Sequence, residues 1–134
     1  MISSFSKSNV TINYIMVQIN TYKDLLIWQK SITLVKEVYS SLELFPKEEK
    51  FGLCKQMGTS AVSIPSNIAE GYGRHSTKEY KRFLLIATGS LFELQTQIEI
   101  SFQLGHIDKI KANELILLTE EIDRMMSSLI KKLI

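Results

Sequence analysis

The chain has 134 residues, of which 45% are hydrophobic and 22% are charged, so it can bury a core and is typical of one globular domain rather than a disordered chain. Its 16 basic and 14 acidic side chains give a net charge of +2, too small to indicate nucleic-acid binding by charge alone. A single cysteine excludes an internal disulfide, and no apolar run reaches the roughly 18 residues of a membrane helix, so we expect a cytoplasmic protein without membrane contact.

Residues 1–21 differ from the rest of the chain. They are rich in Ser, Asn and Thr and show no helical period, which predicts a flexible N-terminal extension. The apolar cluster Tyr14–Val17 is too short for the apolar core of a signal peptide, and Met16 is a candidate for the true start. The alternative is an arm that packs on a neighbouring subunit as a short strand through residues 9–19.

The first two expected helices meet at Pro46. Residues 23–45 carry a heptad-like apolar stripe, and Pro46 stops the helix. The stripe consists of Leu25, Trp28, Ile32, Val35, Tyr39 and Leu42. The second helix is expected to start at Lys47 or Glu48 and to run to Tyr72, with Gly73 as its C-terminal cap. Its stripe consists of Leu53, Met57, Ala61, Ile64 and Ile68.

The third helix is expected to open at Ser76, with Glu79 completing a capping box, and to close at Gly105. Its core stripe consists of Tyr80, Leu84, Ala87, Leu91, Leu94 and Ile98. The fourth begins between residues 107 and 111, and its stripe consists of Leu115, Leu118, Ile122, Met125 and Leu129. Four long helices with short links favour an all-α, antiparallel up-down-up-down four-helix bundle over residues 22–134.

Pro65 lies inside the second helix, where proline removes a backbone hydrogen bond and predicts a kink. A polar stripe surrounds it, at steps of four, three and four residues: Ser63, Asn67, Glu70 and Arg74. We expect Ser63 to bond a freed backbone group, and Asn67 and Glu70 to bridge to a neighbouring helix or subunit. Gly71 would let another backbone come close. These residues either stabilise the kink and tie helices together or form a binding or assembly surface.

Signatures of catalysis and of metal or cofactor binding are missing from the sequence. Neither His75 nor His106 has a glutamate three residues before it, as a di-metal bundle requires, and His106 is expected to be a helix-end residue. Cys54 has no histidine nearby in sequence and is expected to be a small buried residue. Gly89 and Ser90 lie in mid-helix, where we expect them to allow close helix packing. We therefore expect no enzyme, no cofactor and no metal site.

Several motifs together resemble one known family. They are "SIPSNIAEG" at residues 63–71, "GRHSTKEYKRFL" at 73–84 and "ATGSLFEL" at 87–94. The chain from about residue 22 to its end is similar to the bacterial four helix bundle protein family, also called the 23S ribosomal RNA intervening-sequence protein family. That family resembles the accessory variability protein of diversity-generating retroelements, a barrel-shaped homopentamer with a basic surface that binds nucleic acid and a reverse transcriptase.

The resemblance implies a cyclic homo-oligomer, a homopentamer, that contacts RNA or DNA and a partner protein such as a reverse transcriptase. The basic cluster at the start of the third helix would supply the phosphate contacts: Arg74, Lys78, Lys81 and Arg82. Ser63, Pro65, Asn67, Glu70 and Gly71 would form the kink and the subunit contact. The chain departs from the family at Gly58 and Thr59, where relatives commonly carry arginines. This departure removes cations that would neutralise phosphates.

Three functions follow as hypotheses. The first is a non-enzymatic nucleic-acid or ribonucleoprotein accessory factor. The second is a protein–protein adaptor that binds no nucleic acid. The third, which has the least support, is an enzyme with a pocket of buried carboxylates near Glu70.

Overall fold

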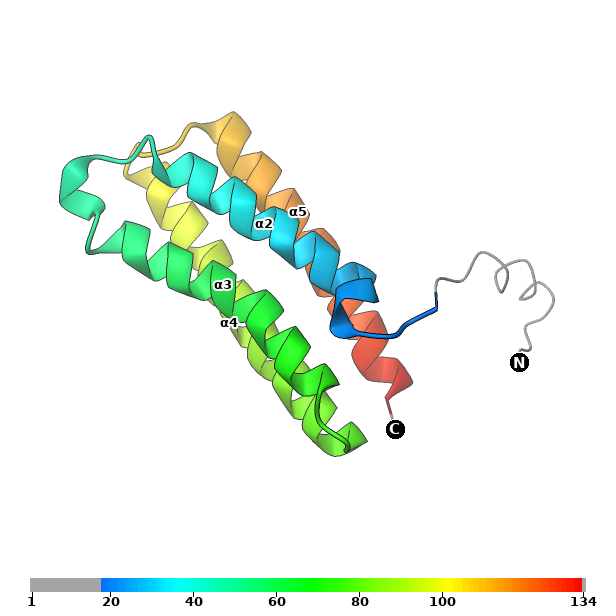
Figure 1. Ribbon diagram of the computed structural model, residues 1–134. Coiled ribbons are helices and arrows are strands. Elements are labelled where there is room, and N and C mark those ends of the chain that lie inside the picture. Colours follow the sequence, from blue (N-terminus) through cyan, green and yellow to red (C-terminus); the bar gives the residue numbers. More distant parts are fainter. Residues whose placement is uncertain (1–17, 134) are drawn as a thin grey trace.

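A computed structural model describes residues 18–133, which form six helical segments and, within that range, no strand (Figure 1). Four are long α-helices: α2 (Leu26–Leu42), α3 (Leu53–Tyr72), α4 (Thr77–Gln103) and α5 (Lys109–Lys132). Two are single 3₁₀ turns: η1 (Tyr22–Asp24) and η2 (Lys47–Glu49). The all-helical prediction is confirmed. Met16, the cluster Tyr14–Val17 and most of the predicted arm lie outside the described residues.

Each long helix contacts two of the other three. The pairs are α2 with α3, α3 with α4, α4 with α5 and α5 with α2, and α3 with α4 is the most extensive. Figure 1 shows the four helices lying side by side along their lengths. This closed set of neighbours surrounds one apolar core, as in a four-helix bundle. Within residues 18–133, none of the helices has the length and apolar character required of a membrane span.

The core faces of α3 and α4 are those that the sequence predicts. Met57, Ala61, Ile64 and Ile68 of α3 are fully buried. The same holds for five of the six α4 stripe residues: Leu84, Ala87, Leu91, Leu94 and Ile98. At the far end of α4, Ser101 Oγ donates to the buried Met57 Sδ across 3.3 Å. Gly105 closes α4 with φ of 79°, the left-handed conformation that favours glycine.

The stripe predicted on the first helix is wrong, because each buried residue lies one position before a predicted one. The buried residues of α2 are Ile27, Ser31, Leu34, Val38 and Ser41. The predicted stripe lies beside this face, and its Tyr39 is 50% exposed. Ser31 and Ser41 are tolerated in the core because their hydroxyls donate to carbonyls of their own helix, those of Ile27 and Val38. On α5, Leu115 and Ile122 are buried as predicted, but the buried methionine is Met126 rather than the predicted Met125.

The predicted starts of the first two helices are also wrong, because each proposed helix divides into a short turn and a long helix. Thr21 and Asp24 form a capping box at the start of η1, and the extended Leu25 ends this turn before α2 begins. Pro46 is extended and starts η2, and α3 begins only at Leu53. The predicted ends at Tyr72 and near Gly105 are confirmed. At Ser76 the capping box is half formed, since Ser76 Oγ accepts from Glu79 N–H while the Glu79 carboxylate accepts from Arg82.

Glu49 links η2 to the turn between α4 and α5. Its Oε2 lies 3.0 Å from His106 Nε2, and its Oε1 accepts the backbone N–H of Leu53 at the start of α3. Phe45 packs against the His106 ring. The hydrogen bond from His106, and after it the one from Leu53, lowers the pKa of Glu49 from its ordinary value of 4.5. The carboxylate therefore holds three segments together.

We expect Gly71→Ala to destabilise the protein by about 1–3 kcal/mol, because the new methyl group would lie 2.8 Å from Phe83 Cβ and 3.2 Å from the Tyr80 carbonyl. Gly89→Ala is the matched control, since a methyl group there meets nothing within 4 Å among the described residues. It should stabilise α4 by about 0.5–1 kcal/mol. Urea unfolding measures both changes, and equal effects at the two glycines would contradict the close contact.

Glu49→Gln should flatten the loss of stability in acid. A carboxylate whose pKa is lowered in the folded state contributes stability above its unfolded pKa, and this contribution is lost as the pH falls through the folded pKa. Thermal unfolding from pH 7 to pH 3 should therefore show a smaller decrease in Tm for Glu49→Gln than for the parent protein. Glu48→Gln is the control, because among residues 18–133 the Glu48 side chain has no hydrogen-bond partner. A decrease equal to the parent's in both variants would refute the role of Glu49.

Candidate functional site

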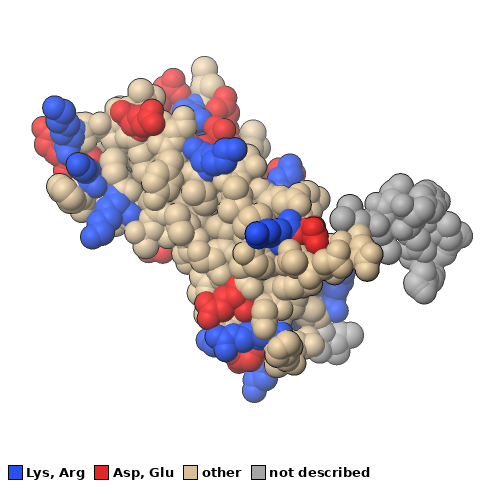
Figure 2. Space-filling view, in the orientation of Figure 1, with Lys and Arg blue, Asp and Glu red and all other residues tan. Residues whose placement is uncertain are grey.

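The predicted basic residues gather where α3 turns into α4. Gly73 N–H donates to the Ala69 carbonyl and Arg74 N–H to the Gly71 carbonyl, which ends α3, and Ser76 then caps α4. This turn lies at the lower end of the molecule in Figure 1. Figure 2 shows basic and acidic side chains side by side at that end. The structure thus brings Arg74, Lys78, Lys81 and Arg82 to one end of the bundle.

Both arginines of this cluster are held by contacts within the chain. Arg74 Nη2 lies 2.8 Å from Glu70 Oε2, and Arg82 Nη2 lies 3.1 Å from Glu79 Oε1. The two guanidinium groups also lie over the ring of Phe83, at 4.9 and 4.6 Å from its centroid. The hydrogen bond from Arg82 lowers the pKa of Glu79 and raises that of Arg82. Each arginine thus has a carboxylate partner and an aromatic contact within the chain.

The two lysines of the cluster stand apart from these pairs. Lys78 and Lys81 are exposed, and among residues 18–133 neither has a carboxylate within 4.0 Å. The turn therefore presents four cations and two carboxylates, and both carboxylates are paired with the arginines. What the cluster can do chemically is attract an anion through the two lysines that have no carboxylate partner among the described residues.

The polar stripe around Pro65 is divided between local and cross-helix contacts. Ser63 Oγ lies 2.8 Å from Ser90 Oγ on α4, while Asn67 Nδ2 donates to the carbonyl and hydroxyl of Ser63. Within the chain, then, Ser63 makes the link between helices. Asn67 and Glu70, which we expected to bridge to a neighbour, bond to residues of their own segment. Pro65 is buried within α3.

The two glycines for which close packing was predicted differ in their surroundings. Gly71 lies directly against Phe83 and Tyr80, as predicted for a close approach. Gly89 was expected to allow close packing, and this is wrong, because among the described residues nothing lies within 4 Å of a methyl group built there. Its neighbour Ser90 makes the contact with α3 instead.

Other predicted residues are placed as follows. The Glu70 side chain is exposed rather than buried, so it lines no carboxylate pocket of the kind that the enzyme hypothesis needs. Residues 18–133 hold no group of three or more His, Cys, Asp or Glu side chains suited to a metal ion. Cys54 is only half-buried, and burial raises the pKa of its thiol. Sequence reasoning missed the role of Phe83, whose signal was an aromatic residue next to Arg82.

Comparison with known proteins gives one family and one fold. The family model described as 23S rRNA-intervening sequence protein matches residues 23–128. A solved structure from Bacteroides thetaiotaomicron VPI-5482, a protein of unknown function from the S23 ribosomal protein family, is similar with a TM-score of 0.72 and 23% identity. The similarity covers 79% of this chain and 99% of that one, and at this identity it shows the fold alone. No protein of curated function matches the chain.

We expect Ser63→Ala to cost about 1 kcal/mol of stability, because it removes the hydroxyl that bonds Ser90 and accepts from Asn67. Urea unfolding of Ser63→Ala, Ser90→Ala and the double variant should give a coupling of roughly 0.5 kcal/mol or more. Ser66→Ala, an exposed serine on the same helix, is the control. Additive effects of the two substitutions would show that the hydroxyls do not interact.

Proposed function

Because this chain belongs to the 23S rRNA-intervening sequence protein family, we propose that it is a non-enzymatic, homo-oligomeric helical protein that binds nucleic acid as an accessory factor. The observation that carries the proposal is the pair of exposed lysines, Lys78 and Lys81, beside two arginines that are paired with carboxylates. Neutralisation of phosphates by Lys and Arg supplies most non-specific affinity for nucleic acid. The turn between α3 and α4 is thus the proposed phosphate-binding surface, for RNA or DNA.

In this proposal the four cations act differently. Lys78 and Lys81 contact phosphates directly. Arg74 and Arg82 hold Glu70 and Glu79, and their positive charge reduces the repulsion that these carboxylates would exert on a phosphate. The N-terminus of α4, which carries the positive end of the helix dipole, adds to the attraction.

The proposed subunit is an antiparallel up-down-up-down bundle with a kink at Pro65. Short links between consecutive helices that contact each other support the antiparallel order. The kink is supported by the chemistry of proline, which has no N–H to offer to the Ala61 carbonyl one turn earlier. The kink and the polar stripe of Ser63, Asn67 and Glu70 then lie close to the subunit contact.

We further propose that subunits assemble as a cyclic homopentamer. Exposed apolar side chains along the outer face of α4 support self-association: Leu85 is 55% exposed, Phe92 48% and Ile100 43%. A ring would repeat the basic turn around one axis, so that the fields of the subunits add. The net charge of +2 for each subunit would then be less of an obstacle to binding.

The second candidate function is a protein–protein adaptor, and the same apolar face of α4 favours it. In that case the face binds another protein, such as a reverse transcriptase, and the lysines are a solvated surface. Both proposals place the protein in the cytoplasm. They differ in whether nucleic acid binds at low salt.

The double variant Lys78→Glu/Lys81→Glu should weaken binding to nucleic acid and reduce the slope of log affinity against log salt by about two. Fluorescence anisotropy of a labelled structured RNA and a labelled DNA duplex, at roughly 50 and 200 mM salt, measures both quantities. Lys36→Glu/Lys109→Glu makes the same charge change at exposed lysines away from the turn and is the control.

Two results would count against the proposal. If the parent protein binds neither nucleic acid at the lower salt, the accessory-factor function is wrong and the adaptor becomes the better candidate. If both double variants weaken binding equally, net charge rather than the turn is responsible. Light scattering of all three proteins checks that the oligomer is unchanged.

A further inference from the structure

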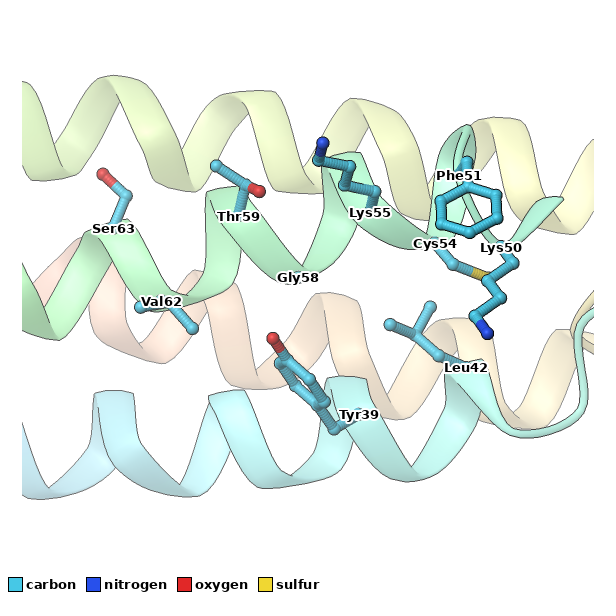
Figure 3. A pocket seen from close by; sticks show the side chains of 10 residues that line it. All are labelled: Tyr39, Leu42, Lys50, Phe51, Cys54, Lys55, Gly58, Thr59, Val62 and Ser63. Carbon is cyan, nitrogen blue, oxygen red and sulfur yellow. The ribbon is translucent and has the colours of Figure 1, made fainter.

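An open hollow lies between α2 and the first half of α3, at the end of α3 opposite the basic turn. Its volume is about 740 Å³, within the range of roughly 300–1,000 Å³ of ligand pockets. Tyr39 and Leu42 rise toward it from α2, and the remaining lining residues lie on α3 or just before it (Figure 3). The central part of this face is largely free of charged side chains in Figure 2.

The aromatic residue at one end of the hollow is unusually open to solvent. Phe51, which lies two residues before the start of α3, is 83% exposed and takes no part in the core. Tyr39 is half exposed and reaches over Gly58, where a methyl group would lie 2.9 Å from its hydroxyl oxygen. Thr59 and Ser63 add hydroxyl groups to the lining. The hollow therefore offers one free aromatic face and several hydrogen-bonding groups.

The charged residues that line the hollow are all basic. Lys50 and Lys55 line it, and Lys50 Nζ lies 5.4 Å from the centroid of the Phe51 ring. None of the lining residues is Asp or Glu. Of the acidic residues near this end of the bundle, Glu43 lines an adjoining pocket, and Glu49 directs its carboxylate to His106 and the Leu53 N–H. A ligand with an aromatic face and negative charges matches this lining.

We propose that the hollow binds an unpaired base of single-stranded nucleic acid, stacked on Phe51, with the flanking phosphates at Lys50 and Lys55. Stacking of bases on exposed aromatic rings beside a basic groove is a common way to bind single strands. The inference rests on the proposed nucleic-acid function and gives it a ligand class, because a base in a duplex is already stacked and cannot reach the ring.

The hollow and the basic turn can lie on one strand. The 20 residues of α3 span about 30 Å, which corresponds to about nine nucleotides at the 3.4 Å spacing of a stacked strand. A strand of 20 nucleotides is therefore long enough to reach both Phe51 and Lys78. A strand of fewer than about nine nucleotides would reach one of them only.

The test is anisotropy with a labelled 20-nucleotide strand of unstructured sequence and a duplex of equal length. Phe51→Ala should weaken binding of the single strand by about 5- to 150-fold and leave duplex binding unchanged. Phe51→Trp should retain binding, whereas Phe51→Leu, which keeps the apolar bulk but not the aromatic face, should lose it. Leu117→Ala removes another well exposed apolar side chain, on α5, and is the control.

Each other outcome overturns the inference in a recognisable way. Unchanged single-strand binding by Phe51→Ala refutes the stacking site and leaves the proposed function intact. Absence of binding by the parent protein to any probe refutes the proposed function and the inference together. Equal binding by Phe51→Leu and Phe51→Trp shows an apolar contact rather than stacking. A smaller particle for Phe51→Ala in light scattering would identify the hollow as a contact between copies of the chain.

Discussion

The approach of α3 to α4 at Gly71 fixes Phe83, and Phe83 in turn fixes the two arginines of the basic turn. Because Gly71 has no side chain, Phe83 can pack close to α3. A methyl group at position 71 would lie only 2.8 Å from the Phe83 Cβ. The ring then supports Arg74 from the end of α3 and Arg82 from the start of α4. Farther along the same pair of helices, Ser63 and Ser90 add a hydrogen bond. The shape of the candidate site thus follows from the packing between these two helices.

The sequence was most informative where a helix has one apolar face. Most of the stripe residues predicted on α3 and α4 are buried, and the two exceptions, Leu53 and Tyr80, are partly buried against the core. On α2 the apolar residues form two adjacent faces, and the one containing Trp28 and Val35 has the more regular pattern. The true core face includes Ser31 and Ser41, whose hydroxyls bond to their own helix, and a hydrophobicity pattern scores such positions as polar. The break after η1 was missed because it depends on the extended backbone of Leu25, an apolar residue that fits the helical pattern.

The candidate site was predictable in part. The close spacing of four basic residues around a short turn between two helices predicts that their side chains lie at one end of the bundle. These residues are Arg74, Lys78, Lys81 and Arg82. The sequence does not show which cations are paired with carboxylates. The Glu79 carboxylate had two possible partners, Ser76 N–H and Arg82, and only the geometry decides between them. The hollow beside Phe51 joins residues of α2 and α3 that are distant in sequence, so no local pattern indicates it. Gly89 shows the same limit, since its position in a helix does not reveal what it faces.

The contact between Gly58 and Tyr39 limits which residues position 58 can accept. Any side chain at position 58 requires Tyr39 to swing away, since even a methyl group would lie 2.9 Å from its hydroxyl. An arginine at this position and the present Tyr39 conformation are therefore mutually exclusive. The effects of substitutions at positions 39 and 58 should therefore be non-additive. An arginine introduced at position 58 alone would displace the Tyr39 ring from its place over α3.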